Sequence, residues 1–289
     1  MTNRMDLIGI VYHPEKEDAR AMATKVESWL VAQGVETWLA RGYDGETLGE
    51  VVQAQLPETS LLVVLGGDGA TLRAARLAAP LRVPLFGINM GRVGFLSEAQ
   101  LDDWQPRLQR VLDGKAWLEH RLMLQADLLR EGQELTQFIA LNDIIVGRGA
   151  QARVLQLHLF VDDNPVTTYT ADALIVATPT GSTAYALAAG GPLLPPQLLN
   201  YLVVPVAPHL SLDRAVILHE EAVVAIEVEM NHEATVAADG QNTTQLQSHD
   251  RVVVRKHEDQ TLFLRVGSPT YFYHRLMERL DFWHPKGLD

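Results

Sequence analysis

Residues 61–79, LLVVLGGDGATLRAARLAA, constrain the fold of this chain more than any other stretch. The five apolar residues 61–65 are typical of a buried strand, and apolar residues at helical spacing begin at Thr71. The turn GGDG lies between them. A glycine-rich turn of this kind lets backbone N–H groups approach an anion at a helix N-terminus, where the macrodipole also favours negative charge. The segment therefore predicts a strand, a turn and a helix that together bind an anionic ligand.

The carboxylate of Asp68 is the unusual part of this turn. It would repel a bound phosphate unless it orients Mg²⁺ or takes a proton from an attacking hydroxyl. This combination indicates phosphoryl transfer onto an alcohol, with Gly66 and Gly67 forming the phosphate loop. The alternative is an ordinary turn between a strand and a helix with a polar tip.

The first hundred residues alternate between strand-like and helix-like segments. Strands are expected at residues 7–12, 35–39, 61–65 and 83–88, and helices at residues 15–33, 48–56 and 101–112, the first closed by Gly34 and the second by Pro57. Strands separated by helices predict a parallel sheet whose ligands sit beyond the carboxyl ends of the strands. The glycine-rich segments 66–69 and 87–94 both fall at such ends, so we expect them to face one crevice.

The pattern changes after residue 117. Runs rich in Val, Ile and Leu follow at residues 122–130, 137–147, 154–161, 172–179, 202–206, 222–230 and 251–256, separated by turn residues. Few helices interrupt them, which predicts a largely antiparallel β domain. We therefore expect an α/β domain with a parallel sheet at residues 1–113, a β-rich domain at 114–262, and a C-terminal segment at 263–289 that packs on the first domain. The aromatic helical pattern at 271–283 is more typical of a core or subunit contact than of base stacking.

Residues 170–194, TADALIVATPTGSTAYALAAGGPLL, form a second dense motif inside the β region. A strand at 173–177 leads into PTGSTAY, where small and hydroxyl residues cluster. Ser182 and Thr183 are placed to N-cap a helix that starts near Ala184. Small side chains at a helix start leave room for a planar ligand, and the hydroxyl and N–H groups supply donors. The alternative is a plain turn.

The composition favours a packed enzyme and excludes several classes of protein. With 47% hydrophobic and 21% charged residues, the 289-residue chain is expected to form a core rather than remain disordered. The absence of cysteine excludes disulfides and thiolate metal sites. No apolar run reaches the length of a membrane span and the N-terminus lacks a signal-peptide layout, so we expect no membrane association and a cytoplasmic location.

The net charge of −12 argues against a nucleic-acid partner. A polyanionic substrate would then need metal ions and basic residues near the site, and the candidates are Arg73, Arg92, Arg148 and Arg153. The ten histidines form no HExxH or other close metal-binding pair, so no metal site made by the protein alone is expected.

The motifs together resemble those of bacterial-type NAD kinases, over about residues 60–245. They are GGDG with an Arg-bearing helix, GRVGFLSE, LNDIIVGRG, TPTGSTAYALAAGGP, PVAPHLSLDRAVIL and ADGQ, in that order. The resemblance implies transfer of the γ-phosphoryl group of ATP to the 2′-hydroxyl of the adenosine ribose of NAD, forming NADP. It also implies an α/β domain and a β-rich domain with the site in the crevice between them. A homodimer or homotetramer, with each site completed by a neighbouring subunit, is implied as well.

The resemblance assigns roles residue by residue. Asp68 corresponds to the general base, Arg73 to a phosphate-side contact, and Asn142 and Asp143 to an Asn-Glu pair that holds hydroxyls of the nucleotide. A divalent metal, Mg²⁺, is implied to arrive with ATP. The other implied substrate contacts are Gly69, Phe95, Arg153, Thr170, Asp172, Thr180, Thr183, Ala184, Tyr185, Ala186, Leu187, Ala188, Ala207 and Gln241.

Two positions depart from the family pattern. Ala70 stands where Thr is usual, and Thr71 is the nearest hydroxyl that could replace it. Asp143 stands where Glu is usual, which shortens the reach of the carboxylate by one methylene. A purely structural role for Asp143 would be to cap a turn or to pair with Arg148.

Two other classes of protein are compatible with part of these motifs. GGDG alone also occurs in diacylglycerol-type lipid kinases and 6-phosphofructokinases, but TPTGSTAY is far more specific and would then be unexplained. A non-catalytic nucleotide sensor could keep the fold, but a pure binder gains nothing from the Asp68 carboxylate beside phosphates.

Overall fold

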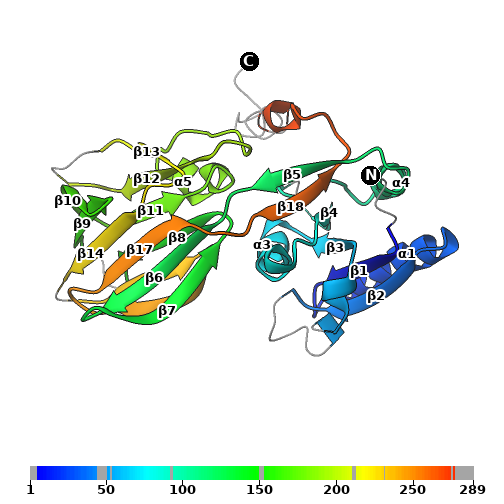
Figure 1. Cartoon of the computed structure of the whole chain (residues 1–289), viewed down its shortest axis with the longest axis horizontal. Helices are drawn as coiled ribbons and strands as arrows, with labels where there is room; N and C mark the ends of the chain where they lie inside the picture. Colours follow the sequence, from blue (N-terminus) through cyan, green and yellow to red (C-terminus); the bar gives the residue numbers. More distant parts are fainter. Residues whose placement is uncertain are drawn as a thin grey trace, which may run out of the picture. The chain divides into compact units, whose positions relative to one another are not determined.

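The computed structural model describes residues 5–43, 51–52, 54–91, 94–149, 153–209, 213–230, 232–274 and 276. The chain divides into two compact units (Figure 1). Unit 1 contains Met1–His120 and Thr261–Asp289, and unit 2 contains Arg121–Gln260. The sequence predicts these limits at residues 113 and 262.

Unit 1 is built on one six-stranded sheet in the order β2-β1-β3-β4-β18-β5. The strands are β1 (Leu7–Tyr12), β2 (Glu36–Arg41), β3 (Leu61–Gly66), β4 (Leu85–Asn89), β5 (Trp117–Arg121) and β18 (Thr261–Arg265). β1 runs parallel to β2 and β3, β3 to β4, and β4 to β18. β18, orange in Figure 1, therefore brings the end of the chain back between β4 and β5. The predicted parallel strands are confirmed for β1–β4 and β18, and the return of the C-terminal segment to the first domain is confirmed for its described residues.

Three helices with an apolar face pack on this sheet: α1 (Glu17–Ala32), α3 (Asp68–Ala78) and α4 (Trp104–Leu112). Two short 3-10 helices, η1 (Leu56–Glu58) and η2 (Ala79–Leu81), precede β3 and follow α3. α1 buries Met22, Val26 and Leu30 at helical spacing, and these pack with α4 and with the Leu61, Val63 and Leu65 face of β3. The alternate residues of β3 are also buried, because α3 contacts β3 and β4.

The helix after GGDG begins at Asp68 and not at Thr71, so the predicted start was wrong. The residues DGA carry no apolar periodicity that could reveal a helical turn. The N-cap is Gly67, in extended conformation, and Asp68 occupies the first turn, where an acidic side chain interacts favourably with the helix macrodipole.

Two predicted helices lie partly outside the described residues. Of the segment 48–56, residues 51, 52, 54 and 55 are helical and lead into η1. Pro57 lies inside η1, so it does not end the helical region as predicted. Of the aromatic segment 271–283, residues 271–274 and 276 are helical, with Phe272 buried and Tyr273 exposed. No helix in the described ranges is both long and apolar enough to cross a membrane.

Unit 2 contains two antiparallel sheets of six strands, ordered β10-β9-β14-β17-β6-β7 and β13-β12-β11-β8-β15-β16. The first has β6 (Leu124–Arg130), β7 (Gln133–Ala140), β9 (Leu155–Val161), β10 (Asn164–Ala171), β14 (Val224–Glu229) and β17 (Arg251–Lys256). The second has β8 (Asp143–Arg148), β11 (Ala173–Ala177), β12 (Asn200–Val206), β13 (Val216–His219), β15 (Ala234–Ala238) and β16 (Gln241–Leu246). One hydrophobic core takes residues from both sheets. The predicted antiparallel β domain is confirmed.

The run 137–147 forms two strands of different sheets rather than one strand. β7 ends at Ala140 and β8 begins at Asp143, so Leu141 and Asn142 make the crossing between the sheets. Periodicity alone could not show this break, because apolar residues continue on both sides of it.

The predicted N-cap in the second motif was also wrong. After β11 the chain forms η3 (Gly181–Thr183) and then the short helix α5 (Tyr185–Ala188), whose N-cap is Ala184. The hydroxyl of Ser182 is buried; it donates to the Pro179 carbonyl at 2.7 Å and accepts from the Leu194 N–H at 3.0 Å. Ser182 therefore joins two segments of the motif and caps no helix.

Candidate active site

Asp68 is held by the segment that follows the neighbouring strand. The backbone N–H of Phe95 donates to its Oδ2 at 3.0 Å, and the N–H of Leu96 donates to its Oδ1 at 3.1 Å. β3 and β4 are parallel neighbours, and Gly66 pairs with Asn89 where both strands end. The turn after β3 and the segment after β4 therefore leave the sheet at the same edge, and the predicted proximity of the two glycine-rich segments is confirmed.

The N-terminus of α3 offers open backbone beside this carboxylate. Gly67 and Gly69 are exposed, and a Cβ on either would meet nothing within 4 Å. Gly66 differs, because a Cβ there would lie 2.5 Å from that of Ala70. Packing thus requires glycine at 66, whereas residues 67 and 69 leave space through which an anion can approach the helix N-terminus.

Arg73 and Tyr43 lie near this turn. Tyr43 is buried and donates its hydroxyl to the Leu65 carbonyl at 2.5 Å, one residue before the turn. Burial raises the pKa of Tyr43, and the charge of Arg73 opposes that rise. Arg73 therefore places a positive charge close to the end of β3. The sequence does not single out Tyr43, since an aromatic residue after a short strand has no distinctive spacing.

Thr71 does not replace the hydroxyl missing at Ala70. Thr71 is buried, and its Oγ1 donates backward to the Gly67 carbonyl at 3.3 Å. This bond is local to the helix and leaves the hydroxyl facing away from solvent.

In unit 2, Asp239 organises the crossing between β7 and β8. Its carboxylate accepts backbone N–H bonds from Leu141 at 3.1 Å, Asn142 at 2.7 Å and Asp143 at 3.2 Å. Asp239 lies in the turn of the β15–β16 hairpin, with φ 53°. The motif ADGQ contains Asp239 but does not indicate this role, because the contact depends on the pairing of β15 with β8.

Asp143 is a buried carboxyl group with a raised pKa. Burial and, second, the negative charge of Asp239 raise the pKa of Asp143 to about 7. The proposed pair with Arg148 does not form. Arg148 lies at the other end of β8, where its Nε is 3.1 Å from Oδ1 of Asp172.

The TPTGSTAY segment packs directly on Asn142. A Cβ on Gly181 would lie 2.1 Å from the Asn142 carbonyl oxygen, so only glycine fits. Thr178 donates its backbone N–H to the same carbonyl at 2.9 Å. Thr180 is buried and accepts a hydrogen bond from Arg121 at 3.0 Å. Arg121 is a second residue that the sequence does not single out, because it is distant from Thr180 along the chain.

The candidate residues of unit 2 form two groups at opposite ends of β11. At its carboxyl end, Ala177 pairs with Asp143, and Ala238, beside Gln241, pairs with Ile144. This end therefore carries Asn142, Asp143, Thr180, Thr183 and Gln241.

The amino end of β11 carries the other group. Asp172 precedes the strand, and Ala173 pairs with Val206, after which comes the exposed Ala207. Thr170 accepts the N–H of His209 at 2.7 Å. Arg153 is exposed, and its carbonyl lies 3.1 Å from Nε2 of His232. A strand rises about 3.3 Å per residue, so the two ends of this five-residue strand are on the order of 15 Å apart.

The residues of α5 differ in exposure. Tyr185 and Ala188 are exposed, Leu187 is half-buried, and Ala186 is fully buried in a hydrophobic cluster with β11 and β12. The roles of Ala184 and of these four residues around an adenine stay predictions. In the described part of the chain, no group of three or more His, Cys, Asp or Glu side chains could hold a metal ion.

The chain matches two domain families. The ATP-NAD kinase N-terminal domain matches residues 8–116, and the ATP-NAD kinase C-terminal domain matches residues 141–266. The NAD kinase of Chloroflexus aurantiacus is 36% identical over 276 residues, which are 96% of this chain and 99% of that protein. The NAD kinase of Heliobacterium modesticaldum is 38% identical over 276 residues, which are 93% of this chain and 96% of that protein.

Solved structures are similar over nearly the whole chain. An NAD kinase from Archaeoglobus fulgidus in complex with ATP has a TM-score of 0.77 and 25% identity, and the match covers 95% of this chain and 98% of that chain. Yeast NADH kinase complexed with NADH has a TM-score of 0.86, covering 100% of this chain and 91% of that chain. At 23% identity, this second likeness shows the fold alone.

Proposed function

The chain belongs to the ATP-NAD kinase family and is therefore an enzyme that phosphorylates NAD, and we propose that Asp68 is the general base of this reaction. The 2′-hydroxyl of the adenosine ribose gives its proton to the Asp68 carboxylate as its oxygen bonds to the γ-phosphorus of ATP. The bond between that phosphorus and the β–γ bridging oxygen breaks, and ADP leaves with the electron pair.

The hydrogen bonds of Asp68 support this role. The N–H groups of Phe95 and Leu96 fix both carboxylate oxygens. A carboxylate can accept about four hydrogen bonds, so two N–H donors leave capacity for a substrate hydroxyl. A base held in one orientation saves the cost of ordering it during the reaction.

We propose that the phosphates of ATP lie at the N-terminus of α3. The exposed backbone at Gly67 and Gly69 and the nearby charge of Arg73 support this position. Phosphoryl transfer depends on neutralising the charge of the transferring group, and this chain has a net charge of −12. A divalent cation, Mg²⁺, enters with ATP in this proposal, as part of the nucleotide substrate.

NAD is proposed to bind through the group at the carboxyl end of β11. Asn142 and Asp143 lie there on a turn that Asp239 holds through three N–H bonds, so both residues start from a fixed backbone. The solved NAD kinase from Archaeoglobus fulgidus holds ATP, and the family match and the curated NAD kinases support NAD as the second substrate.

A homo-oligomer is the second part of this proposal. The group at the amino end of β11, with Asp172 and Ala207, is on the order of 15 Å from the group at the carboxyl end. Such a separation suits a chain that contributes one group to its own site and the other to the site of a neighbouring copy. Measuring the mass of the protein in solution tests this directly: a dimer or tetramer is expected, and an active monomer would contradict it.

NADP formation tests the function itself. The protein is incubated with ATP, Mg²⁺ and NAD, and NADP is measured with an NADP-specific dehydrogenase. We expect NADP to accumulate in proportion to the protein and to require ATP. ATP consumption with a diacylglycerol or sugar phosphate but without NADP would instead favour a lipid or sugar kinase. Binding of NAD without turnover would favour a nucleotide sensor.

A further inference from the structure

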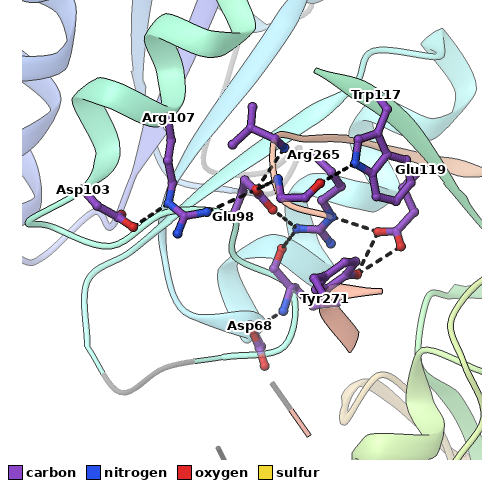
Figure 2. A network of polar contacts seen from close by, with 11 residues as sticks. Asp68, Glu98, Asp103, Arg107, Trp117, Glu119, Arg265 and Tyr271 are labelled. Carbon is purple, nitrogen blue, oxygen red and sulfur yellow. Dashed lines mark hydrogen bonds and ion pairs between the residues drawn. The ribbon is translucent and has the colours of Figure 1, made fainter. Parts of the chain in front are cut away.

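Arg265, the last residue of β18, is a fully buried cation in unit 1 (Figure 2). Its Nε donates to Oε2 of Glu119 at 2.8 Å, and its Nη1 lies 3.4 Å from Oε2 of Glu98. The guanidinium carbon lies over the rings of Phe263 and Tyr271, at 4.6 and 5.1 Å from their centroids. Burial alone would lower the pKa of Arg265, but Tyr271, Glu119 and Glu98 raise it above its ordinary value, so the side chain stays charged.

The same guanidinium is connected to Asp68 through one residue. Nη1 of Arg265 donates to the carbonyl of Leu96 at 2.9 Å. The N–H of Leu96 donates to Oδ1 of Asp68 at 3.1 Å. Thus the two polar backbone groups of Leu96 join a buried cation to the carboxylate that receives the proton.

Glu98 provides a second connection between the segment 96–98 and the end of β18. Its Oε1 accepts the backbone N–H groups of Val266 and Gly267, both at 3.0 Å. The segment 96–98 is therefore tied to the end of β18 at two points, one of them the Arg265 side chain. The bond from Arg265 to the Leu96 carbonyl continues through the Leu96 N–H to Asp68, which lies next to this network in Figure 2.

The arrangement requires arginine rather than lysine. Arginine carries five N–H donors in a rigid fork, so Nε can hold Glu119 while Nη1 holds Leu96. A lysine ammonium has one nitrogen on a flexible stem and cannot reproduce both contacts from one fixed position.

We propose that Arg265 is a positioning residue for the phosphoryl transfer: it fixes the Leu96 carbonyl so that the Leu96 N–H holds the Asp68 carboxylate in line with the acceptor hydroxyl. The inference rests on the proposed role of Asp68 as general base. Because Arg265 is fully buried, in this proposal it acts only through the segment 95–98.

A double-mutant cycle of Arg265→Lys and Asp68→Asn tests the proposal on the full-length protein. With Asp68 present, we expect Arg265→Lys to lower kcat at least about tenfold and to leave KM for NAD and ATP within about twofold. In the Asp68→Asn background the same change should alter the residual kcat by less than about twofold, because the carboxylate to be positioned is gone.

Arg107→Gln is the matched control. Arg107 also pairs with Glu98, at 3.5 Å, but from the α4 side, where it bonds Asp103 as well (Figure 2). It makes no contact with Leu96 in the described structure, so Arg107→Gln should keep kcat within about twofold. A similar loss in Arg107→Gln and Arg265→Lys would indicate a general effect on stability and would overturn the proposal.

The outcomes separate this proposal from the proposed function. A folded Arg265→Lys enzyme with normal kcat, or one that loses the same factor with and without Asp68, overturns the positioning role and leaves the general base intact. A normal kcat for Asp68→Asn overturns both.

If Arg265→Lys shows no cooperative thermal unfolding, Glu98→Gln replaces Arg265→Lys in the cycle. Glutamine at 98 removes a charge beside Arg265 and keeps an oxygen that can accept the N–H groups of Val266 and Gly267. With Asp68 present, the kcat of Glu98→Gln should fall at least about threefold, and in the Asp68→Asn background it should not fall further. An unchanged kcat in the presence of Asp68 overturns the proposal.

Discussion

A Cβ on Gly94 would lie 2.0 Å from Oδ1 of Asp68, well inside van der Waals contact. The two residues that follow Gly94 are the ones whose N–H groups hold the same carboxylate. Glycine at 94 is therefore what allows the segment after β4 to close on Asp68.

Gly94→Ala should impair the reaction more than the fold. The added methyl must push the carboxylate away from the Phe95 and Leu96 N–H groups, and general-base catalysis depends on its placement. We expect kcat to fall at least about tenfold, and by no more than the factor of about 10²–10⁴ that a positioned base contributes. Gly91→Ala is the control, because a Cβ there meets nothing within 4 Å. Equal kcat values for the two variants would show that the contact is unimportant.

Local patterns in the sequence predicted the elements that carry the site. The β3 apolar run followed by GGDG and the alternation of strands and helices gave the parallel sheet, and the Val- and Ile-rich runs gave the antiparallel sheets. The helix start at Asp68 was missed because small residues carry no periodicity. The break at Leu141 and Asn142 was missed because hydrophobicity does not reveal a change of sheet.

The residues that support the site could not be found this way. Arg265 reaches Leu96 only because β18 lies between β4 and β5, and Asp239 reaches Asn142 only through the pairing of β15 with β8. Both contacts depend on the order of strands far apart in the sequence, and an isolated Arg or Asp has no spacing that indicates such a contact. A resemblance to a family supplied candidate ligand contacts, but it assigned no role to Arg265 or Asp239.

Asp143→Ala should weaken NAD binding. At pH 8, where the Asp143 carboxyl with its pKa of about 7 is mostly ionised, losing a charged hydrogen-bond partner costs about 1.5–3 kcal/mol, which corresponds to roughly 10–150-fold in affinity. KM for NAD should rise by about that factor, while KM for ATP stays nearly constant. Asp143→Glu, which keeps the carboxylate, should stay within about tenfold of the parent. A lower melting temperature with unchanged KM for NAD would instead assign Asp143 a structural role.

The raised pKa of Asp143 predicts a pH-dependent stability. Its value is about 7 in the folded protein, against 3.8 for an ordinary aspartate, so between these values the folded state binds a proton that the unfolded chain has released. Stability contributed by this group therefore falls as pH rises through that window, by at most about 1.4 kcal/mol per pH unit. The melting temperature of Asp143→Asn relative to the parent should increase between pH 5 and pH 8. A difference that is constant with pH would show that Asp143 is ionised throughout.

Removing divalent metal should abolish turnover. Phosphoryl transfer needs charge neutralisation at the γ-phosphate, and this chain carries a net charge of −12. We expect excess EDTA to eliminate NADP formation and Mg²⁺ or Mn²⁺ to restore it, with the melting temperature of the ligand-free protein unaffected. Full activity in excess EDTA would contradict a metal-dependent donor.

The most direct test of the account is the kcat of Asp68→Asn, with NAD binding measured on the same preparation by calorimetry. Asparagine keeps the size of the side chain and removes the base. General-base catalysis is typically worth about 10²–10⁴-fold, or roughly 3–5 kcal/mol of activation free energy. We predict that kcat falls at least about 10²-fold while the dissociation constant for NAD changes less than about threefold. A folded variant that binds NAD and turns it over at a near-normal rate would contradict the assignment of Asp68 as the base.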